Sequence, residues 1–266
     1  MVHYLWKRRH LLPSMIDDIW QWENVEAASA AAQRSRLEGL AAAAAGVCVC
    51  RGDWPSFVVN NFLLNGIPLG ELCYDVLQAL AKGRSEVTPV LVLAGRSGGE
   101  GKSAFLKPLH CIYDGFVFSL TTGREAGNFP LVDLPGAKVA LLDEYRFDQS
   151  IVSYASQNLW FDGSAVPIGR PQNITGATGN MLYKGTAPLF ITTKLVDLER
   201  LEQSAQTNPA TQLPWDTEAS MLCRRLKVYK FCHRVPKPPR SFPPCGRCFA
   251  RLVHDQAAAW DATQRQ

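Results

Sequence analysis

The sequence predicts an α/β protein in which a largely parallel sheet is flanked by helices. Between residues 87 and 231, short apolar stretches rich in β-formers alternate with helical patterns, which is typical of parallel sheets covered on both faces. The first of these stretches, residues 89–94, runs into a glycine-dense loop that leads directly into a helical pattern. The 266 residues suffice for one substantial domain with extensions or for two small domains.

The composition is that of a globular protein and not of a disordered one, with 47% hydrophobic and 20% charged residues. A net charge of +4 permits a nucleic-acid partner without demonstrating one. No apolar run reaches the roughly 18 residues of a membrane span, and Pro13 interrupts the N-terminal apolar stretch, which makes it a poor secretory signal. Eight cysteines without such a signal predict an intracellular, reducing location, where metal binding or burial is favoured over disulfides.

The expected elements follow in chain order. We expect a helix over residues 14–45, capped by Ser14 and ended by Gly46, then an amphipathic helix over residues 69–80 that Gly83 ends. The next elements are strands at 89–94, 116–120, 138–144, 188–193 and 226–231, and helices at 103–111, at 149–160 and ending at 221–225. From residue 232 the chain is proline-rich and basic, which predicts a linker or an extended strap.

The glycine-dense loop has the residues of a phosphate cradle: Gly98, Gly99 and Gly101 precede Lys102 and Ser103. Glycines let backbone N–H groups converge on an anion, lysine reaches the β- and γ-phosphates, and the serine hydroxyl completes the coordination of Mg²⁺. The spacing departs from G-x-x-x-x-G-K-[ST], because Arg96 stands where the first glycine belongs and Gly95 comes one residue early. The loop is therefore either a phosphate loop longer by one residue or a glycine-rich turn that arose by chance.

Two acidic residues, Asp143 and Glu144, end the apolar stretch that begins at Lys138. Ligands of open α/β sheets bind at the carboxyl edge of the strands. Asp143 would hold Mg²⁺ through water, and Glu144 would orient and deprotonate the attacking water. The alternative is a strand that happens to end in a charged turn.

With these blocks the chain resembles the superfamily 3 helicases of small DNA viruses and related mobile elements, a branch of the AAA+ ATPases. The resemblance covers about residues 57–231. It rests on the segments GRSGGEGKS (95–103), VALLDEYRF (139–147), WFDGSAVPIGRPQN through YKGTAPLFITTK (160–194) and CRRLKVYKF (223–231).

The resemblance implies ATP and Mg²⁺ as cofactors and a role for each matching residue. Arg225, with Arg224 as the adjacent alternative, matches the arginine finger that reaches the next subunit's γ-phosphate, which implies a ring, typically a homo-hexamer. The segment from Arg170 to Lys184 would carry a pore hairpin whose two terminal cations grip single-stranded DNA; otherwise it is a surface loop. Lys194 stands where the family usually has asparagine. It would either donate to phosphate oxygens or mark a weakly active ATPase.

The cysteines near the C-terminus form a separate question, because Cys245 and Cys248 have the C-x-x-C spacing of half a zinc site. The residues considered to complete it are Cys232, His233 and His254. The alternative is a pair of small buried cysteines in a turn. We interpret Cys48 and Cys50 as a pair in a strand or turn and not as metal ligands, and Cys73 as a core residue.

These expectations divide the chain into a helical segment (1–56), an ATPase and helicase domain (57–231) and a small basic tail with a zinc knuckle (232–266). The function they favour is an ATP-dependent, ring-forming helicase of viral or mobile-element type. It would act on single-stranded or forked DNA, without a membrane, in the nucleus or at the site of the element's replication. The alternatives are a catalytically weak nucleotide-binding module that binds nucleic acid, an RNA-directed ATPase, and a structural protein whose tail carries the function.

Overall fold

The centre of the molecule is a sheet of five parallel strands in the order β2-β3-β6-β1-β7. The computed structural model describes residues 29–96, 98–120, 130–169, 181–208, 211, 213–236 and 241–265. The strands are β1 (Val90–Gly95), β2 (Val117–Ser119), β3 (Val139–Leu142), β6 (Leu189–Lys194) and β7 (Leu226–Phe231). The expected α/β class and parallel sheet are confirmed.

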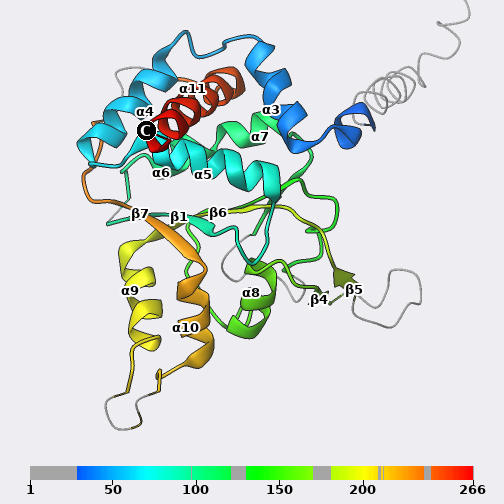
Figure 1. The fold of residues 1–266 in the computed structure, drawn as a ribbon, viewed down its shortest axis with the longest axis vertical. Helices are drawn as coiled ribbons and strands as arrows, with labels where there is room; N and C mark the ends of the chain where they lie inside the picture. Colours follow the sequence, from blue (N-terminus) through cyan, green and yellow to red (C-terminus); the bar gives the residue numbers. More distant parts are fainter. Residues whose placement is uncertain are drawn as a thin grey trace, which may run out of the picture.

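Helices cover both faces of this sheet (Figure 1). The first layer consists of α3 (Arg36–Ala45), α4 (Asp53–Leu64), α5 (Leu69–Lys82), α6 (Lys102–Leu106), α7 (Pro108–Ile112) and α11 (Gly246–Gln264). The second consists of α8 (Tyr154–Phe161), α9 (Leu195–Ser204), α10 (Thr217–Arg224) and an antiparallel pair of strands, β4 (Val166–Ile168) and β5 (Met181–Tyr183).

Alternate residues of each strand enter the two cores. In β1, Leu91 and Leu93 face the first layer, whereas Val90, Val92 and Ala94 face the second. Because both faces are covered, every residue of β1 and β3 is buried. This explains why these strands form continuous apolar runs in the sequence and do not alternate with polar residues.

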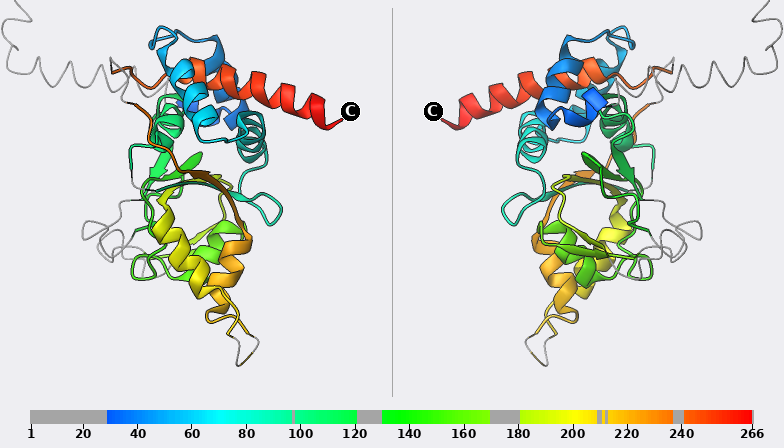
Figure 2. Two further views of the ribbon diagram at one scale, coloured as in Figure 1. Left: turned by 90° about the vertical axis from the view of Figure 1, so that its left-hand side faces the viewer. Right: turned by 90° about the vertical axis from the view of Figure 1, so that its right-hand side faces the viewer.

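The C-terminal segment is a core element, which corrects the expectation of an extended basic tail for residues 241–265. Helix α11 packs along α5 and α3, as Figure 2 shows from two sides. Phe249, Val253 and Ala257 are at most 1% exposed and recur every four residues, so they form one apolar stripe. The proline-rich segment before α11 favours an extended chain, and the prediction wrongly carried this over to the helix that follows.

Several boundaries also differ from those expected. Residues 29–33 are helical, but this helix ends before α3, which begins anew with a capping box formed by Ser35 and Glu38. The expected cap, Ser14, lies outside the described residues. The expected helix 103–111 is divided into α6 and α7 at Pro108, which cannot donate the backbone hydrogen bond that a continuous helix needs. The expected boundary between residues 56 and 57 falls inside α4.

Within the described residues, no helix combines the length and apolar content needed to cross a bilayer.

Candidate functional site

The candidate site lies at the carboxyl edge of the sheet. Since the strands are parallel, the loop after β1, the acids after β3 and the end of β6 all reach this edge, and β6 lies between β1 and β3. A cavity of about 210 Å³ opens there. Its lining includes most of the predicted nucleotide residues, namely Gly98, Gly99, Gly101, Lys102, Ser103, Glu144 and Lys194, together with Glu100, Ala104, Thr192 and Thr193. The predicted Asp143 lines the neighbouring cavity instead.

The glycine-rich loop has a backbone that only glycine adopts without strain. Gly98, Gly99 and Gly101 have φ angles of 91°, 81° and 76°. A Cβ on Gly101 would also lie 2.5 Å from Asn61 Nδ2. The Asn61 amide donates to the carbonyl of Glu100 at 2.9 Å. The loop is thus fixed from α4.

The interior of the loop already holds an anion. Lys102 Nζ lies 2.9 Å from Glu100 Oε2, and the backbone N–H of Gly98 donates to Glu100 Oε1 at 2.9 Å. Both charged side chains are buried, with Glu100 1% and Lys102 9% exposed. In this arrangement the Glu100 carboxylate stands in for the phosphate oxygens that such donors bind. A Cβ at Gly95 would come within 2.1 Å of Lys102 Nζ and 2.7 Å of Glu100 Oε2, so a larger residue there would displace this ion pair.

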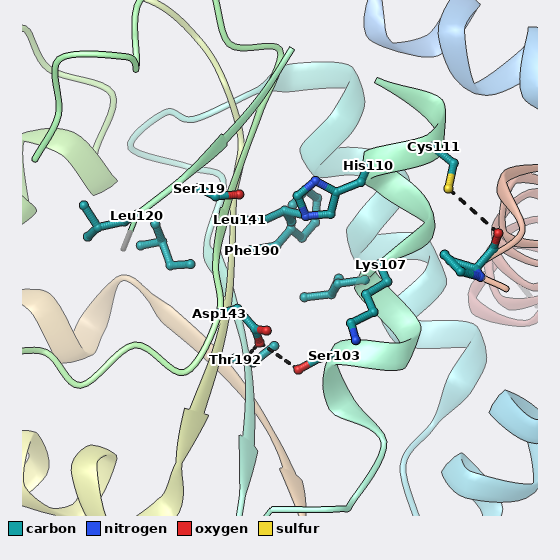
Figure 3. A pocket seen from close by; sticks show the side chains of 13 residues that line it. Ser103, Lys107, His110, Cys111, Ser119, Leu120, Leu141, Asp143, Phe190 and Thr192 are labelled. Carbon is teal, nitrogen blue, oxygen red and sulfur yellow. Dashed lines mark hydrogen bonds between the residues drawn. The ribbon is translucent and has the colours of Figure 1, made fainter. Parts of the chain in front are cut away.

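The predicted metal residues are hydrogen-bonded to each other. Ser103 Oγ donates to Asp143 Oδ1 at 2.7 Å, and Thr192 donates its hydroxyl to the same oxygen. Figure 3 shows the three side chains converging from α6, from the residue after β3 and from β6. Hydroxyl and carboxylate oxygens are the hard ligands that Mg²⁺ prefers, so this donor set fits that ion.

Glu144 is held in an unusual backbone conformation next to this group. Its φ of 51° is in the left-handed region, which is uncommon for residues other than glycine. Its N–H donates to Thr192 Oγ1 at 2.9 Å, and the following N–H, of Tyr145, donates to the Thr192 carbonyl at 2.8 Å. Burial raises the pKa of Tyr145. The Glu144 side chain is exposed and lines the cavity opposite the loop.

A second, larger cavity of about 360 Å³ shares Ser103 and Thr192 with the first. It opens between α6–α7 and the strands β2, β3 and β6 (Figure 3). Its lining is mainly apolar, with His110 and Lys107 among its polar members. His110 is exposed there.

The expected hairpin is present at its base, where β4 pairs with β5. Lys184 follows β5 and is exposed, whereas Arg170 lies outside the described residues. Arg84, which follows α5, contacts the hairpin base: its guanidinium donates to Trp160 O and Ser164 O, each at 2.9 Å, and lies 4.8 Å from the centre of the Tyr183 ring. The hairpin base is therefore rigidly attached to the second helical layer.

The two candidate finger residues are not equivalent. Arg225 precedes β7, so it lies at the amino edge of the sheet, opposite the glycine-rich loop. There Arg225 forms an ion pair with Asp162 at 3.0 Å, with its side chain 22% exposed. Arg224 is exposed at the end of α10. The arrangement makes Arg224 the better candidate for contact with another subunit.

The C-terminal cysteines have a different set of neighbours from the one expected. Cys245 and Cys248 lie with Cys48 and Cys50, and all four sulfurs are within 4.8 Å of one another. Cys232 and His254 are exposed and do not belong to this group, nor does His233. The interpretation of Cys48 and Cys50 as an independent pair is therefore wrong. The two cysteines that complete the group with Cys245 and Cys248 lie about two hundred residues earlier in the chain.

Three further residues of the candidate site were not singled out from the sequence: Asn61, Glu100 and Thr192. Thr192 had the clearest signal, since polar residues at the end of a buried apolar strand point to a ligand-binding edge. Asn61 had a weaker one, as a polar residue on an otherwise apolar stretch of helix.

No family model and no curated protein matches the chain. Solved structures do match, among them "The apo structure of NrS-1 C terminal region (305-718)", with a TM-score of 0.45, 15% identity and coverage of 78% of this chain and 44% of that one. A second, "The A form apo structure of NrS-1 C terminal region-CTR", has a TM-score of 0.43, 14% identity and coverage of 77% and 44%. The chain thus spans less than half of these NrS-1 chains.

Proposed function

We propose that this protein is a P-loop ATPase of the superfamily 3 helicase type, which hydrolyses ATP with Mg²⁺ and moves along single-stranded or forked DNA as a homo-hexameric ring. The observation that supports this most is the cavity at the carboxyl edge, where the glycine-rich loop after β1 and Glu144 after β3 line one space across β6, with Asp143 bonded to Ser103 beside it. Sequence resemblance suggested these residues independently of their position in space. Such an enzyme would act where a virus or mobile element replicates, in a nucleus or elsewhere in a cell.

The site residues divide the work of phosphoryl transfer. The N–H groups of the glycine-rich loop and Lys102 bind the β- and γ-phosphates once the Glu100 carboxylate gives up its place. Ser103 and Asp143 would hold Mg²⁺, which supplies charge neutralisation at the transferred group. Glu144 accepts a proton from the attacking water, and its backbone bond to Thr192 fixes the direction of approach. Lys194 donates to phosphate oxygens.

A finger residue from the next subunit completes the charge stabilisation. An arginine at this step adds about 10³ to 10⁵ to the rate in P-loop enzymes. Because Arg224 and Arg225 lie at the amino edge of the sheet, they act on the site of a neighbouring chain and not on their own. The β4–β5 hairpin with Lys184 contacts the DNA phosphates.

One observation favours the alternative of a weak or inactive ATPase. The Glu100–Lys102 ion pair occupies the phosphate position, so ATP competes with an internal carboxylate. Such a protein would bind nucleotide and nucleic acid with little turnover.

ATP hydrolysis measured with and without single-stranded DNA tests the proposal. The wild-type protein should show turnover that DNA stimulates. Lys102→Ala should abolish it, whereas Lys82→Ala, which removes an exposed lysine at the end of α5, should leave it unchanged. Single-stranded RNA in the same assay tests the RNA-directed alternative.

ATP binding without hydrolysis would rule out a motor and support the nucleotide-binding module. Equal turnover in the wild-type and Lys102→Ala proteins would show that the cavity is not the active site.

A further inference from the structure

Four cysteine sulfurs from the two ends of the folded chain converge at one point between α3, α4 and α11. Cys48 and Cys50 lie in the connection from α3 to α4, Cys245 is the N-cap of α11, and Cys248 is in its first turn. The Cys48–Cys248 and Cys50–Cys248 sulfur distances are 3.5 Å, and the Cys48–Cys50 distance is 3.8 Å.

These distances match one tetrahedral metal ion. Four thiolates bound about 2.3 Å from zinc at tetrahedral angles lie about 3.8 Å from one another. A disulfide instead requires about 2.05 Å between two sulfurs, and the pairwise contacts give no cysteine a single preferred partner.

Backbone N–H groups point toward two of the four sulfurs. The N–H groups of Val49, Cys50 and Cys248 donate to the sulfur of Cys245. Those of Gly52 and Trp54 donate to Cys50. Such donors orient metal-bound ligands and disperse their charge.

The turn formed by Arg51 and Gly52 orients backbone N–H groups toward Cys50. Arg51 and Gly52 have φ angles of 54° and 91°, and two successive residues of this type turn their N–H groups toward one point. Arg51 and Arg247 stand next to the cysteines in the sequence, and their charges oppose the double negative charge of a zinc tetrathiolate.

Two of the four cysteines are buried within the first helical layer. Cys50 is 2% and Cys245 0% exposed, and the nearby Trp54 and Phe249 are 1% and 0% exposed. Their rings lie 6.0 Å apart. Cys48 and Cys248 are partly exposed. Four protein thiolates leave no open position on a tetrahedral ion, so a structural role fits and a catalytic one does not.

We propose that Cys48, Cys50, Cys245 and Cys248 bind one structural zinc ion that fastens α11 to the α3–α4 connection. The proposal does not depend on the ATPase activity. It does bear on the phosphate site, because α4 begins three residues after Cys50 and carries Trp54, whose Nε1 donates to Ala104 O of α6 at 2.9 Å.

Elemental analysis of the purified full chain in the presence of reductant tests the proposal. We expect about one zinc per chain after gel filtration. The double variant Cys48→Ser/Cys50→Ser should lose zinc at least about tenfold, and the matched double variant Cys232→Ser/His254→Ala should keep it. Cobalt substituted for zinc should give the absorption of a tetrahedral tetrathiolate.

Alkylation of the wild-type protein keeps the test independent of the variants' ability to fold. With metal bound, peptide mass spectrometry should find the four cysteines protected, while the exposed Cys111 and Cys232 react. A chelator strong enough to remove zinc should make the four reactive. A wild-type chain without zinc, one that binds iron instead, or zinc loss confined to Cys232→Ser/His254→Ala would overturn the proposal.

Discussion

Replacing Glu100 with glutamine should make the protein bind ATP more tightly. The Glu100 carboxylate lies inside the glycine-rich loop, where it accepts from Lys102 and from the Gly98 N–H, each at 2.9 Å. Under the proposed function, ATP must displace it before these donors can bind phosphate. Glutamine has the same shape but no charge, so it holds the donors less strongly and does not repel the nucleotide.

The size of the effect follows from the bonds that change. A hydrogen bond to a charged group contributes about 1.5–3 kcal/mol, and a neutral one about 0.5–1.5 kcal/mol. The substitution should therefore lower the cost of displacement by about 1–2 kcal/mol, which corresponds to roughly five- to thirty-fold tighter binding.

Titration calorimetry of wild-type and Glu100→Gln proteins with ATP measures this difference directly. Glu86→Gln is the control, since Glu86 is an exposed glutamate outside the cavity. If Glu100→Gln folds normally but binds ATP as the wild type does or more weakly, then the carboxylate supports the loop and does not occupy the phosphate position.

Three further substitutions test the core, the acidic group and the finger. Phe249→Ala removes a ring that is 0% exposed and should cost about 3–5 kcal/mol of stability, lowering the melting temperature by about 6–20 °C. Asp255→Ala, on the exposed side of α11, should change the melting temperature little. Equal melting temperatures of the two variants would show that α11 is not a core helix. Thr192→Val removes the hydroxyl bonded to the carboxylate after β3 and should lower turnover by about 10²-fold with ATP affinity retained, so unchanged turnover would contradict the assigned geometry. Arg224→Ala should reduce ATP hydrolysis by about 10³-fold or more without altering the melting temperature. Arg225→Ala should instead lower the melting temperature, because it breaks the ion pair with Asp162. The reverse pattern would make Arg225 the finger.

Much of the fold could be predicted because its signals are local. The strand before Gly95, the glycines after it and the apolar run before Asp143 each follow from neighbouring residues, and the parallel sheet then places them at one edge. The amphipathic helix ending at Gly83 is equally local, with a periodicity that matches its buried face.

The remaining features depend on contacts between distant parts of the chain. Cys48 and Cys50 gave no sign of their partners because about two hundred residues separate them from Cys248. Glu100 was overlooked for another reason: only the folded loop turns its carboxylate inward toward Lys102. Helix α11 was missed because its apolar stripe follows a proline-rich segment and contains only a few large residues.

The position of α11 has a consequence for how the protein is made. This helix covers α5 and α3, which the ribosome completes well over a hundred residues earlier. Until α11 has been translated, the apolar faces of those earlier helices have no cover, and exposed surface of this kind makes folding intermediates prone to aggregate. A nascent chain should therefore need a chaperone to occupy that face, and release should coincide with the arrival of α11.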